Sequence, residues 1–143
     1  MQRTVSVPSL DQCDDLIHTF RALYQDRKVF AFHGELGAGK TTLIKVLCQD
    51  LGVTDEMSSP SFGLVNAYAT AQADDVYHFD LYRLRSTREL VDIGWFDYLD
   101  QEKIMFIEWP EMAGELLPDD TVDVSIAVDT NNQQRTLTIT YQP

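Results

Sequence analysis

The chain has 143 residues, of which 44% are hydrophobic and 24% charged, and this length and composition predict one globular domain over residues 1–143. Eleven basic against 23 acidic residues give a net charge of −12 and argue against a surface that grips nucleic acid, because such surfaces are basic. There is no apolar run of membrane-spanning length and no signal-peptide pattern, and Cys13 and Cys48 lack metal-ligand spacing. We therefore predict a cytoplasmic protein with two reduced thiols.

The first elements predicted along the chain are a strand, a helix and a second strand. Residues 3–7 are typical of a short strand that Pro8 closes. Ser9 and Gln12 then form the S-x-x-Q pattern of a capping box, which is followed by apolar residues at helical spacing. Residues 28–32 are a short apolar run and predict the strand that leads into the next motif.

Residues 34–41 have the pattern G-x-x-x-x-G-K-T of a phosphate-binding loop. Glycines let successive backbone N–H groups converge on phosphate oxygens, and the helix predicted over residues 42–51 adds the positive end of its dipole. Lys40 supplies a point charge for the outer phosphates, and the Thr41 hydroxyl is a Mg²⁺ ligand. The predicted nucleotide-binding residues are Gly34, Glu35, Leu36, Gly37, Ala38, Gly39, Lys40, Thr41 and Thr42.

The middle of the chain predicts two strands. Residues 59–63 on their own favour a turn that leads into an alternating strand over residues 62–68. A second strand is predicted over residues 75–84, where a period of two places His78, Asp80 and Tyr82 on one face. Two metal-ligand types without a third are weak evidence for a metal site, so His78 is predicted to pack or to form a hydrogen bond.

The last third of the chain completes the predicted fold. Ser86 and Glu89 form a second capping box before two short helical segments. Residues 104–107 are typical of a strand buried on both faces, and Glu108 follows where phosphate-binding-loop proteins place the acid that orders the Mg²⁺ shell. Alternation over residues 122–128 and 137–141 predicts a hairpin at one sheet edge. The predicted fold class is α/β, a P-loop NTPase-like three-layer domain with a mostly parallel central sheet and a C-terminal antiparallel hairpin.

Four stretches, taken together, resemble the TsaE family, the small bacterial ATPases needed to make threonylcarbamoyladenosine in tRNA. They are residues 34–42, 59–62, 78–84 and 108–109, and they occur in the family's order over nearly the whole chain. The usual family motif Ser-Pro-Thr-Phe-Thr differs here at two positions. Ser61 keeps the hydroxyl of the usual threonine, whereas Gly63 lacks one.

The resemblance implies ATP and Mg²⁺ as ligands, with Lys40 and Thr41 as phosphate and metal contacts. It also implies that Ser61 lies in a switch segment next to the nucleotide and that Glu108 contacts Mg²⁺. Asp80 and Lys40 would be the catalytic residues, with Asp80 orienting the attacking water or the metal shell. The implied partners are TsaD-like and TsaB-like proteins, which would hold the tRNA and stimulate slow ATP hydrolysis by this chain.

Two other functions are compatible with the same loop. A small-molecule kinase would use Arg83, Arg85 and Arg88 as a lid over the transferred phosphoryl group, although no segment for an acceptor substrate is evident. A nucleotide-gated adapter would use ATP only to set a conformation. A GTPase is disfavoured, because the chain has no N-K-x-D base-reading motif.

Overall fold

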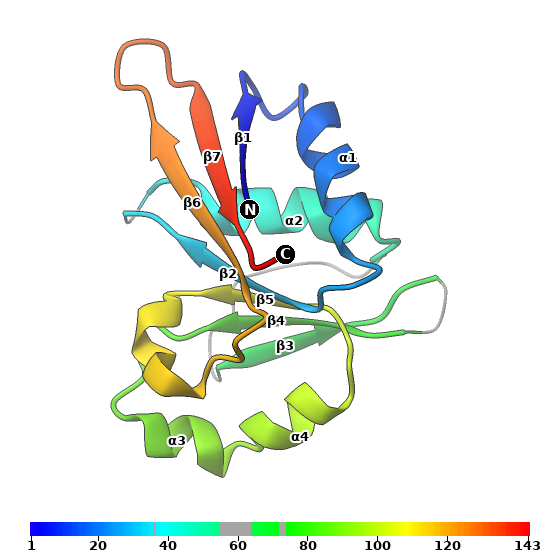
Figure 1. Ribbon diagram of the computed structural model, residues 1–143, viewed down its shortest axis with the longest axis vertical. Coiled ribbons are helices and arrows are strands. Elements are labelled where there is room, and N and C mark those ends of the chain that lie inside the picture. Colours follow the sequence, from blue (N-terminus) through cyan, green and yellow to red (C-terminus); the bar gives the residue numbers. More distant parts are fainter. Residues whose placement is uncertain (36, 55–63, 72–73) are drawn as a thin grey trace.

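A computed structural model describes residues 1–35, 37–54, 64–71 and 74–143. Within these residues seven strands form one sheet in the order β1-β7-β6-β2-β5-β4-β3 (Figure 1). The strands are β1 (Gln2–Val7), β2 (Val29–His33), β3 (Val65–Tyr68), β4 (Val76–Asp80), β5 (Met105–Glu108), β6 (Val122–Val128) and β7 (Arg135–Thr140). The helices are α1 (Asp14–Leu23), α2 (Lys40–Asp50), α3 (Thr87–Asp92), α4 (Trp95–Asp100) and the 3₁₀ segment η1 (Pro110–Leu116).

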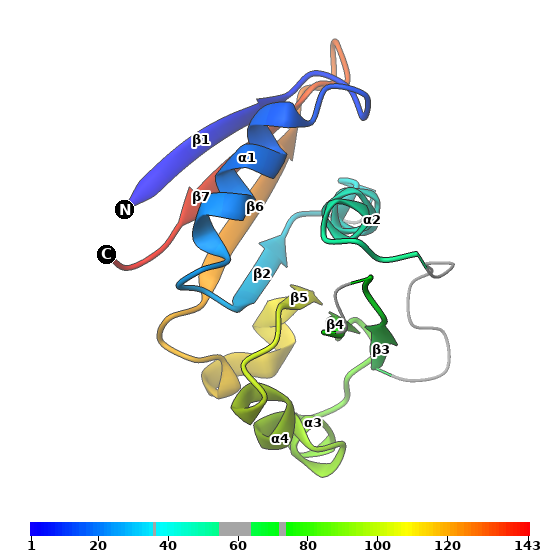
Figure 2. The same ribbon diagram turned by 90° about the vertical axis from the view of Figure 1, so that its right-hand side faces the viewer.

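Helices cover both faces of the sheet, as predicted for a three-layer domain. On one face α1 and α2 bury a cluster in which Phe20 stacks on Phe30, with ring centroids 5.3 Å apart. On the other face α3, α4 and η1 bury a second cluster, where Phe79 meets Trp95 edge-to-face at 5.2 Å. Figure 2 shows α2 and the α3–α4 pair on opposite sides of strands β2, β5 and β4. Among the residues that the structure describes, no helix is both long and apolar enough to cross a membrane.

The sheet is mixed, so the prediction of a mostly parallel sheet was only partly right. The four central strands β6, β2, β5 and β4 are parallel to one another, whereas β7, β1 and β3 pair antiparallel. The predicted C-terminal hairpin is present as β6 and β7, but it does not form the sheet edge. Strand β1 pairs with β7 and takes the edge, because the register of Val5 opposite Leu137 buries both side chains.

Neither predicted capping box forms with its side-chain bonds, although the second correctly marks the start of a helix. Helix α1 begins at Asp14, because Ser9 and Gln12 instead form a turn in which the Gln12 backbone N–H donates to the Ser9 carbonyl at 3.0 Å. Ser86 is the N-cap of α3 without a side-chain cap bond. The Glu89 carboxylate accepts from the backbone N–H of Arg85 at 3.3 Å, one residue before the predicted donor.

The end of α2 agrees with prediction. Gly52 has a φ of 96°, the left-handed conformation that a helix C-terminus favours in glycine. Its N–H donates to the Gln49 carbonyl, and the N–H of Val53 donates to the Cys48 carbonyl, both at 3.1 Å. These two bonds form a Schellman motif that ends the helix.

Candidate functional site

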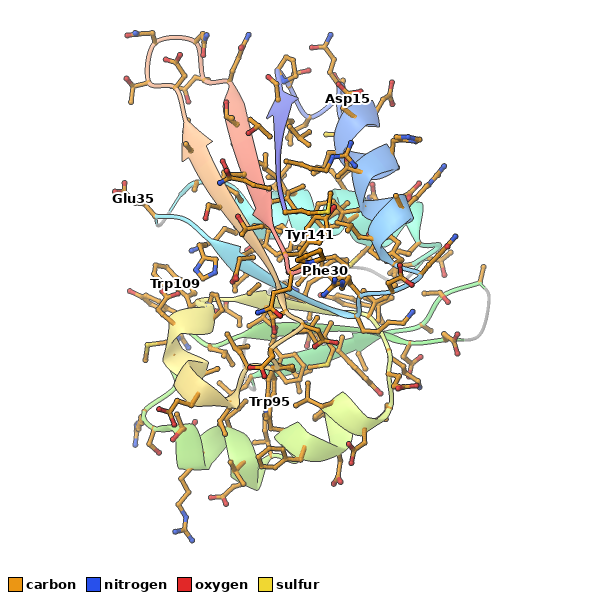
Figure 3. The ribbon with its side chains drawn as sticks, in the orientation of Figure 1. Asp15, Phe30, Glu35, Trp95, Trp109 and Tyr141 are labelled. Atoms are coloured by element: carbon orange, nitrogen blue, oxygen red, sulfur yellow. The ribbon has the colours of Figure 1, made fainter. Side chains whose placement is uncertain are left out.

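The predicted phosphate-binding loop joins β2 to α2 at the carboxyl end of the central parallel strands. Figure 3 shows the labelled Glu35 and Trp109 at this same edge of the molecule. Gly37 and Gly39 have φ values of 85° and 93°, a backbone conformation that residues with a Cβ rarely adopt. Gly39 is also the N-cap of α2. Leu36 lies outside the described residues, as do Ser61 and the rest of the predicted switch segment.

The loop borders a cavity of about 450 Å³ that gathers most of the predicted site residues. Lys40 and Thr41 come from the start of α2, Asp80 from the end of β4 and Glu108 from the end of β5. The described lining residues are Gly37, Gly39, Lys40, Thr41, Thr42, Asp80, Tyr82, Glu108, Trp109 and Arg135. An adjoining cavity of about 480 Å³ shares Gly37 and extends between the loop and strand β6.

Glu108 is the centre of a buried polar network. The Thr41 hydroxyl donates to its carboxylate, at 2.8 Å from one oxygen and 2.9 Å from the other. The His78 Nε2 lies 2.6 Å from the second oxygen. His78 and Glu108 are only 1% and 3% exposed, so these bonds replace the solvation that burial removes. The prediction that His78 packs or forms a hydrogen bond is therefore confirmed, and its hydrogen-bond partner is the predicted metal-shell acid.

Asp80 lies opposite Glu108 on the neighbouring parallel strand. Strand β4 ends at Asp80, so the predicted strand over residues 75–84 was too long, and Tyr82 does not share a strand face with Asp80. Instead, the backbone N–H of Tyr82 donates to Asp80 Oδ1 at 3.1 Å. Partial burial raises the pKa of Asp80, and the negative charge of the nearby Glu108 raises it further. The hydrogen bond from the Tyr82 backbone opposes this shift.

Lys40 is a buried cation that faces several polar groups. Its Nζ donates to the Gly34 carbonyl at 2.7 Å and lies 3.5 Å from the centroid of the Trp109 ring. Burial lowers the pKa of Lys40, while the charges of Glu108, Glu111 and Asp80 oppose that shift. Because little solvent reaches the Lys40 ammonium group, its cation–π contact with Trp109 partly stabilises the charge.

Arg135 is a site residue that sequence reasoning missed. It begins β7, and its Nε donates to the Ala38 carbonyl at 2.9 Å, across 97 positions of the chain. A Cβ placed on Gly39 would lie 2.8 Å from the same Nε, so this glycine is needed for close approach as well as for its φ. Arg83, Arg85 and Arg88, the arginines considered for a lid, are exposed and do not contribute to the described lining.

The Thr41 and Glu108 oxygens fit a Mg²⁺ ion. Bonds of about 2.1 Å in an octahedron put neighbouring ligands about 3 Å apart, close to the 2.8 and 2.9 Å between these oxygens. In the described part of the chain no cluster of three or more His, Cys, Asp or Glu side chains could by itself hold a metal. Mg²⁺ usually completes its shell with phosphate oxygens and water, so a full protein cage is not required.

Comparison with known proteins identifies the family. Residues 7–137 match the family described as "Threonylcarbamoyl adenosine biosynthesis protein TsaE". This chain belongs to the TsaE family. The TsaE protein of Haemophilus influenzae is 35% identical over 121 residues, which are 84% of this chain and 75% of that protein. The TsaE protein of Treponema pallidum is 36% identical over 106 residues, 74% of this chain and 77% of that protein.

A solved structure supports the fold independently. The crystal structure of YdiB from Bacillus subtilis matches with a TM-score of 0.75, covering 99% of this chain and 86% of that one at 22% identity. The resemblance seen in the motifs is thereby confirmed at the level of family and fold. The chain is a member of a family of tRNA threonylcarbamoyladenosine biosynthesis.

Proposed function

We propose that this TsaE-family chain binds ATP with Mg²⁺ beside the phosphate-binding loop and hydrolyses it slowly in support of threonylcarbamoylation of adenosine in tRNA. The observation that carries the proposal is the convergence of Lys40, Thr41, Asp80 and Glu108 on one cavity from α2, β4 and β5. Phosphate-binding-loop proteins that hydrolyse ATP use the same parts, namely a loop, a cation, a hydroxyl group and acidic side chains.

Phosphate binding would rest on the loop and on two cations. Gly37 and Gly39, both with positive φ, line the cavity, and so do the first residues of the 11-residue helix α2, whose positive end therefore lies there. Lys40 would exchange its bond to the Gly34 carbonyl for phosphate oxygens. Arg135, which is bonded to the Ala38 carbonyl of the loop, would add positive charge at the same cavity.

The two carboxylates would divide the chemistry. Mg²⁺, when bound, supplies positive charge that neutralises charge developing on the phosphates. Thr41 and Glu108 would hold it, since their oxygens already have a suitable spacing and His78 fixes the carboxylate. Asp80 accepts one backbone hydrogen bond among the described residues, which leaves its carboxylate with capacity to orient the attacking water or a water of the metal shell.

The proposed partners are TsaD-like and TsaB-like proteins in the cytoplasm. A net charge of −12 makes this chain a poor holder of tRNA, so the partners would take that part. Intrinsic hydrolysis would be slow, because rapid phosphoryl transfer needs the transition-state charge to be fully surrounded by fixed donors, and partners can order or supply them.

Calorimetric ATP titration and steady-state hydrolysis with and without the two partner proteins test this proposal. We expect ATP binding that requires Lys40, and a low hydrolysis rate that the partners raise. ATP consumption that rises only with a small-molecule acceptor would identify a kinase instead. ATP binding without any hydrolysis in a single-turnover experiment, partners included, would identify an adapter. Absence of ATP binding by the folded protein would overturn the proposal altogether.

A further inference from the structure

A histidine and two carboxylates meet at the base of the phosphate-binding loop. His33 is the last residue of β2 and directly precedes Gly34, the first residue of the loop pattern. Its Nε2 lies 2.8 Å from Asp123 Oδ1 on β6, and its Nδ1 lies 3.9 Å from Glu111 Oε2 on η1. Side chains from three elements thus form one group, which we call the His33 cluster.

The two ring nitrogens of His33 face different acceptors. An ionised carboxylate only accepts hydrogen bonds, so Nε2 carries a hydrogen that it donates to Asp123. In the neutral ring Nδ1 then carries no hydrogen and presents a lone pair to the Glu111 carboxylate. Protonation places an N–H on Nδ1 and turns this contact into an ion pair. The charge of Glu111 is therefore partly neutralised only when His33 is protonated, a change that histidine side chains ordinarily make between about pH 5 and 8.

The other charged side chains on the elements around the cluster are mostly acidic. The loop carries the exposed Glu35, and η1 carries the exposed Glu115. Strand β5 ends in Glu108, whose carboxylate is already bonded within the buried network, and α2 begins with the buried cation Lys40. A neutral His33 leaves this side of the loop acidic, which opposes an anionic ligand by charge repulsion. A protonated His33 reduces that repulsion.

The His33 cluster is connected to Lys40 from two sides. The carbonyl of Gly34, the residue after His33, accepts a hydrogen bond from Lys40 Nζ at 2.7 Å. On the other side, Glu111 lies two residues after Trp109, whose ring centroid is 3.5 Å from the same Nζ. Burial lowers the pKa of Lys40, and the charge of Glu111 is one of those that oppose this shift. The cluster therefore acts on the proposed phosphate-binding cation both through the chain and through charge.

We propose that His33 is a positioning residue of the phosphate-binding loop and that its protonation, by pairing with Glu111, favours binding of the ATP phosphates. The inference rests on the proposed function, because it takes ATP as the ligand. Binding and protonation then favour each other by linkage, so ATP affinity rises as the pH falls and ATP binding takes up protons near neutral pH. The side chains of the cluster are partly exposed, so salt should weaken this coupling.

Calorimetric ATP titrations at about pH 6 and about pH 8 test the inference. ATP itself gains a proton in this range, so the wild type is compared with His33→Gln, which cannot be charged. The affinity of the wild type should rise about three- to fivefold more than that of His33→Gln between the higher and the lower pH, the range for a partly exposed charge pair. His33→Arg, which is always charged, should lose the same pH dependence but keep the tighter affinity at the higher pH. The exposed His18→Gln is the matched control and should keep the wild-type pH profile.

Proton uptake separates the charge of His33 from a structural role. Titrations in buffers of different ionisation enthalpy count the protons that accompany ATP binding, and the wild type should take up more of them near pH 7 than His33→Gln does. Glu111→Gln should reduce this excess, because it removes the partner that protonation engages. Glu115→Gln, on the same segment, should leave the excess unchanged.

The outcomes separate this inference from the proposed function. Parallel pH profiles and equal proton uptake in wild type and His33→Gln would overturn the role of His33 and leave ATP binding standing. An equal loss of affinity at both pH values in His33→Gln and His33→Arg would overturn it too, because His33 would then only support the fold. If His33→Gln does not fold, unequal proton uptake in Glu111→Gln and Glu115→Gln supports the inference, and equal uptake overturns it. Absence of ATP binding by the folded wild type at either pH would remove the proposed function itself.

Discussion

The ends of β4 and β5 carry two carboxylates that face each other across one pair of parallel strands but lie in different surroundings. Glu108 at the end of β5 is buried and bonded to Thr41 and His78. Asp80 at the end of β4 is partly exposed, bonds to a single backbone N–H among the described residues and has a raised pKa. The first carboxylate is held in place, and the second can change its hydrogen-bonding partner.

This difference is the basis on which we propose separate tasks for the two acids. A ligand of a metal shell must keep its geometry through the reaction, which the Thr41–Glu108–His78 network provides. A group that orients water needs accessible acceptor positions and benefits from a pKa closer to neutrality. Lys40 lines the same cavity as both acids, and their charges oppose the lowering of its pKa. Substitutions at Lys40, Asp80, Glu108 and His78 can therefore test whether the division is real.

The largest effect is expected for Lys40→Ala, which removes the cation that lines the same cavity as both acids. ATP affinity should fall about 100-fold or more, because charge-assisted bonds to phosphate contribute about 1.5–3 kcal/mol each. Calorimetric titration measures the loss. Lys45→Ala, on the same helix, is the matched control and should bind ATP normally. Unchanged affinity in a folded Lys40→Ala protein would show that the loop is not a phosphate site.

Asp80→Asn should reduce the hydrolysis rate about 100-fold while leaving the Mg²⁺ requirement as in the wild type. The amide keeps the size of the side chain but is a poor acceptor for a proton and cannot hold water in the same orientation. Single-turnover rates over a range of Mg²⁺ concentrations measure both quantities, with the exposed Asp119→Asn as a control. A rate restored by excess Mg²⁺ would place Asp80 in the metal shell and remove the contrast with Glu108.

Glu108→Gln should lower the hydrolysis rate and raise the Mg²⁺ concentration needed for half of the residual rate, about 30-fold. The amide has one neutral oxygen in place of a charged carboxylate, so it binds Mg²⁺ weakly. The same Mg²⁺ titrations measure the shift, and Glu115→Gln supplies an exposed control. Superimposable titration curves for Glu108→Gln and wild type would remove Glu108 from the metal site.

His78→Asn should shift the Mg²⁺ requirement in the same direction as Glu108→Gln but by about tenfold only. His78 acts through the Glu108 carboxylate, and changes to such supporting partners typically cost 10–100-fold in metal affinity. ATP affinity without Mg²⁺ should stay unchanged, which a general loss of structure would not allow. The exposed His18→Asn is the control. A loss of Mg²⁺-free ATP binding in His78→Asn would mean that His78 supports the fold rather than the carboxylate.

Parts of this site follow from local sequence patterns. The loop pattern over residues 34–41 and the apolar run that ends at Glu108 are local features, and the structure brings Lys40, Thr41 and Glu108 to one cavity. Asp80 lines the same cavity, but its place there was expected only from the family resemblance. Hydrogen bonding by His78 was also predicted, though without its partner. The role of Ser61 stays a prediction, because it lies outside the described residues.

Other parts depend on pairings between distant segments, for which a single sequence carries no signal. The edge position of β1 comes from its pairing with β7, and the contact of Arg135 with Ala38 depends on the order of β7, β6 and β2 in the sheet. The left-handed conformation of Trp109 could not be predicted from the sequence either, because no local rule predicts it for a bulky residue. Strand order and register, rather than element type, were therefore the missing information.

The smallest expected effect is the change in stability caused by Asp80→Asn, and the change caused by Glu108→Gln has the opposite sign. Burial and the Glu108 charge raise the pKa of Asp80 above that in the unfolded chain, so the native state binds this proton more tightly than the unfolded state does. The ionised carboxylate therefore costs stability at pH values above its raised pKa, and the cost disappears as the pH falls below its unfolded value of about 3.9. Asp80→Asn removes the cost and should be more stable than wild type at pH 7 by less than about 1 kcal/mol, because solvent screens a partly exposed group. The gain should shrink toward pH 4.

Glu108→Gln should instead destabilise the protein by about 1–3 kcal/mol at pH 7, because it leaves buried partners poorly bonded. Denaturant unfolding at both pH values measures these differences, and an Asp80→Asn protein less stable than wild type at pH 7 would show that the Asp80 carboxylate, like that of Glu108, holds the structure together.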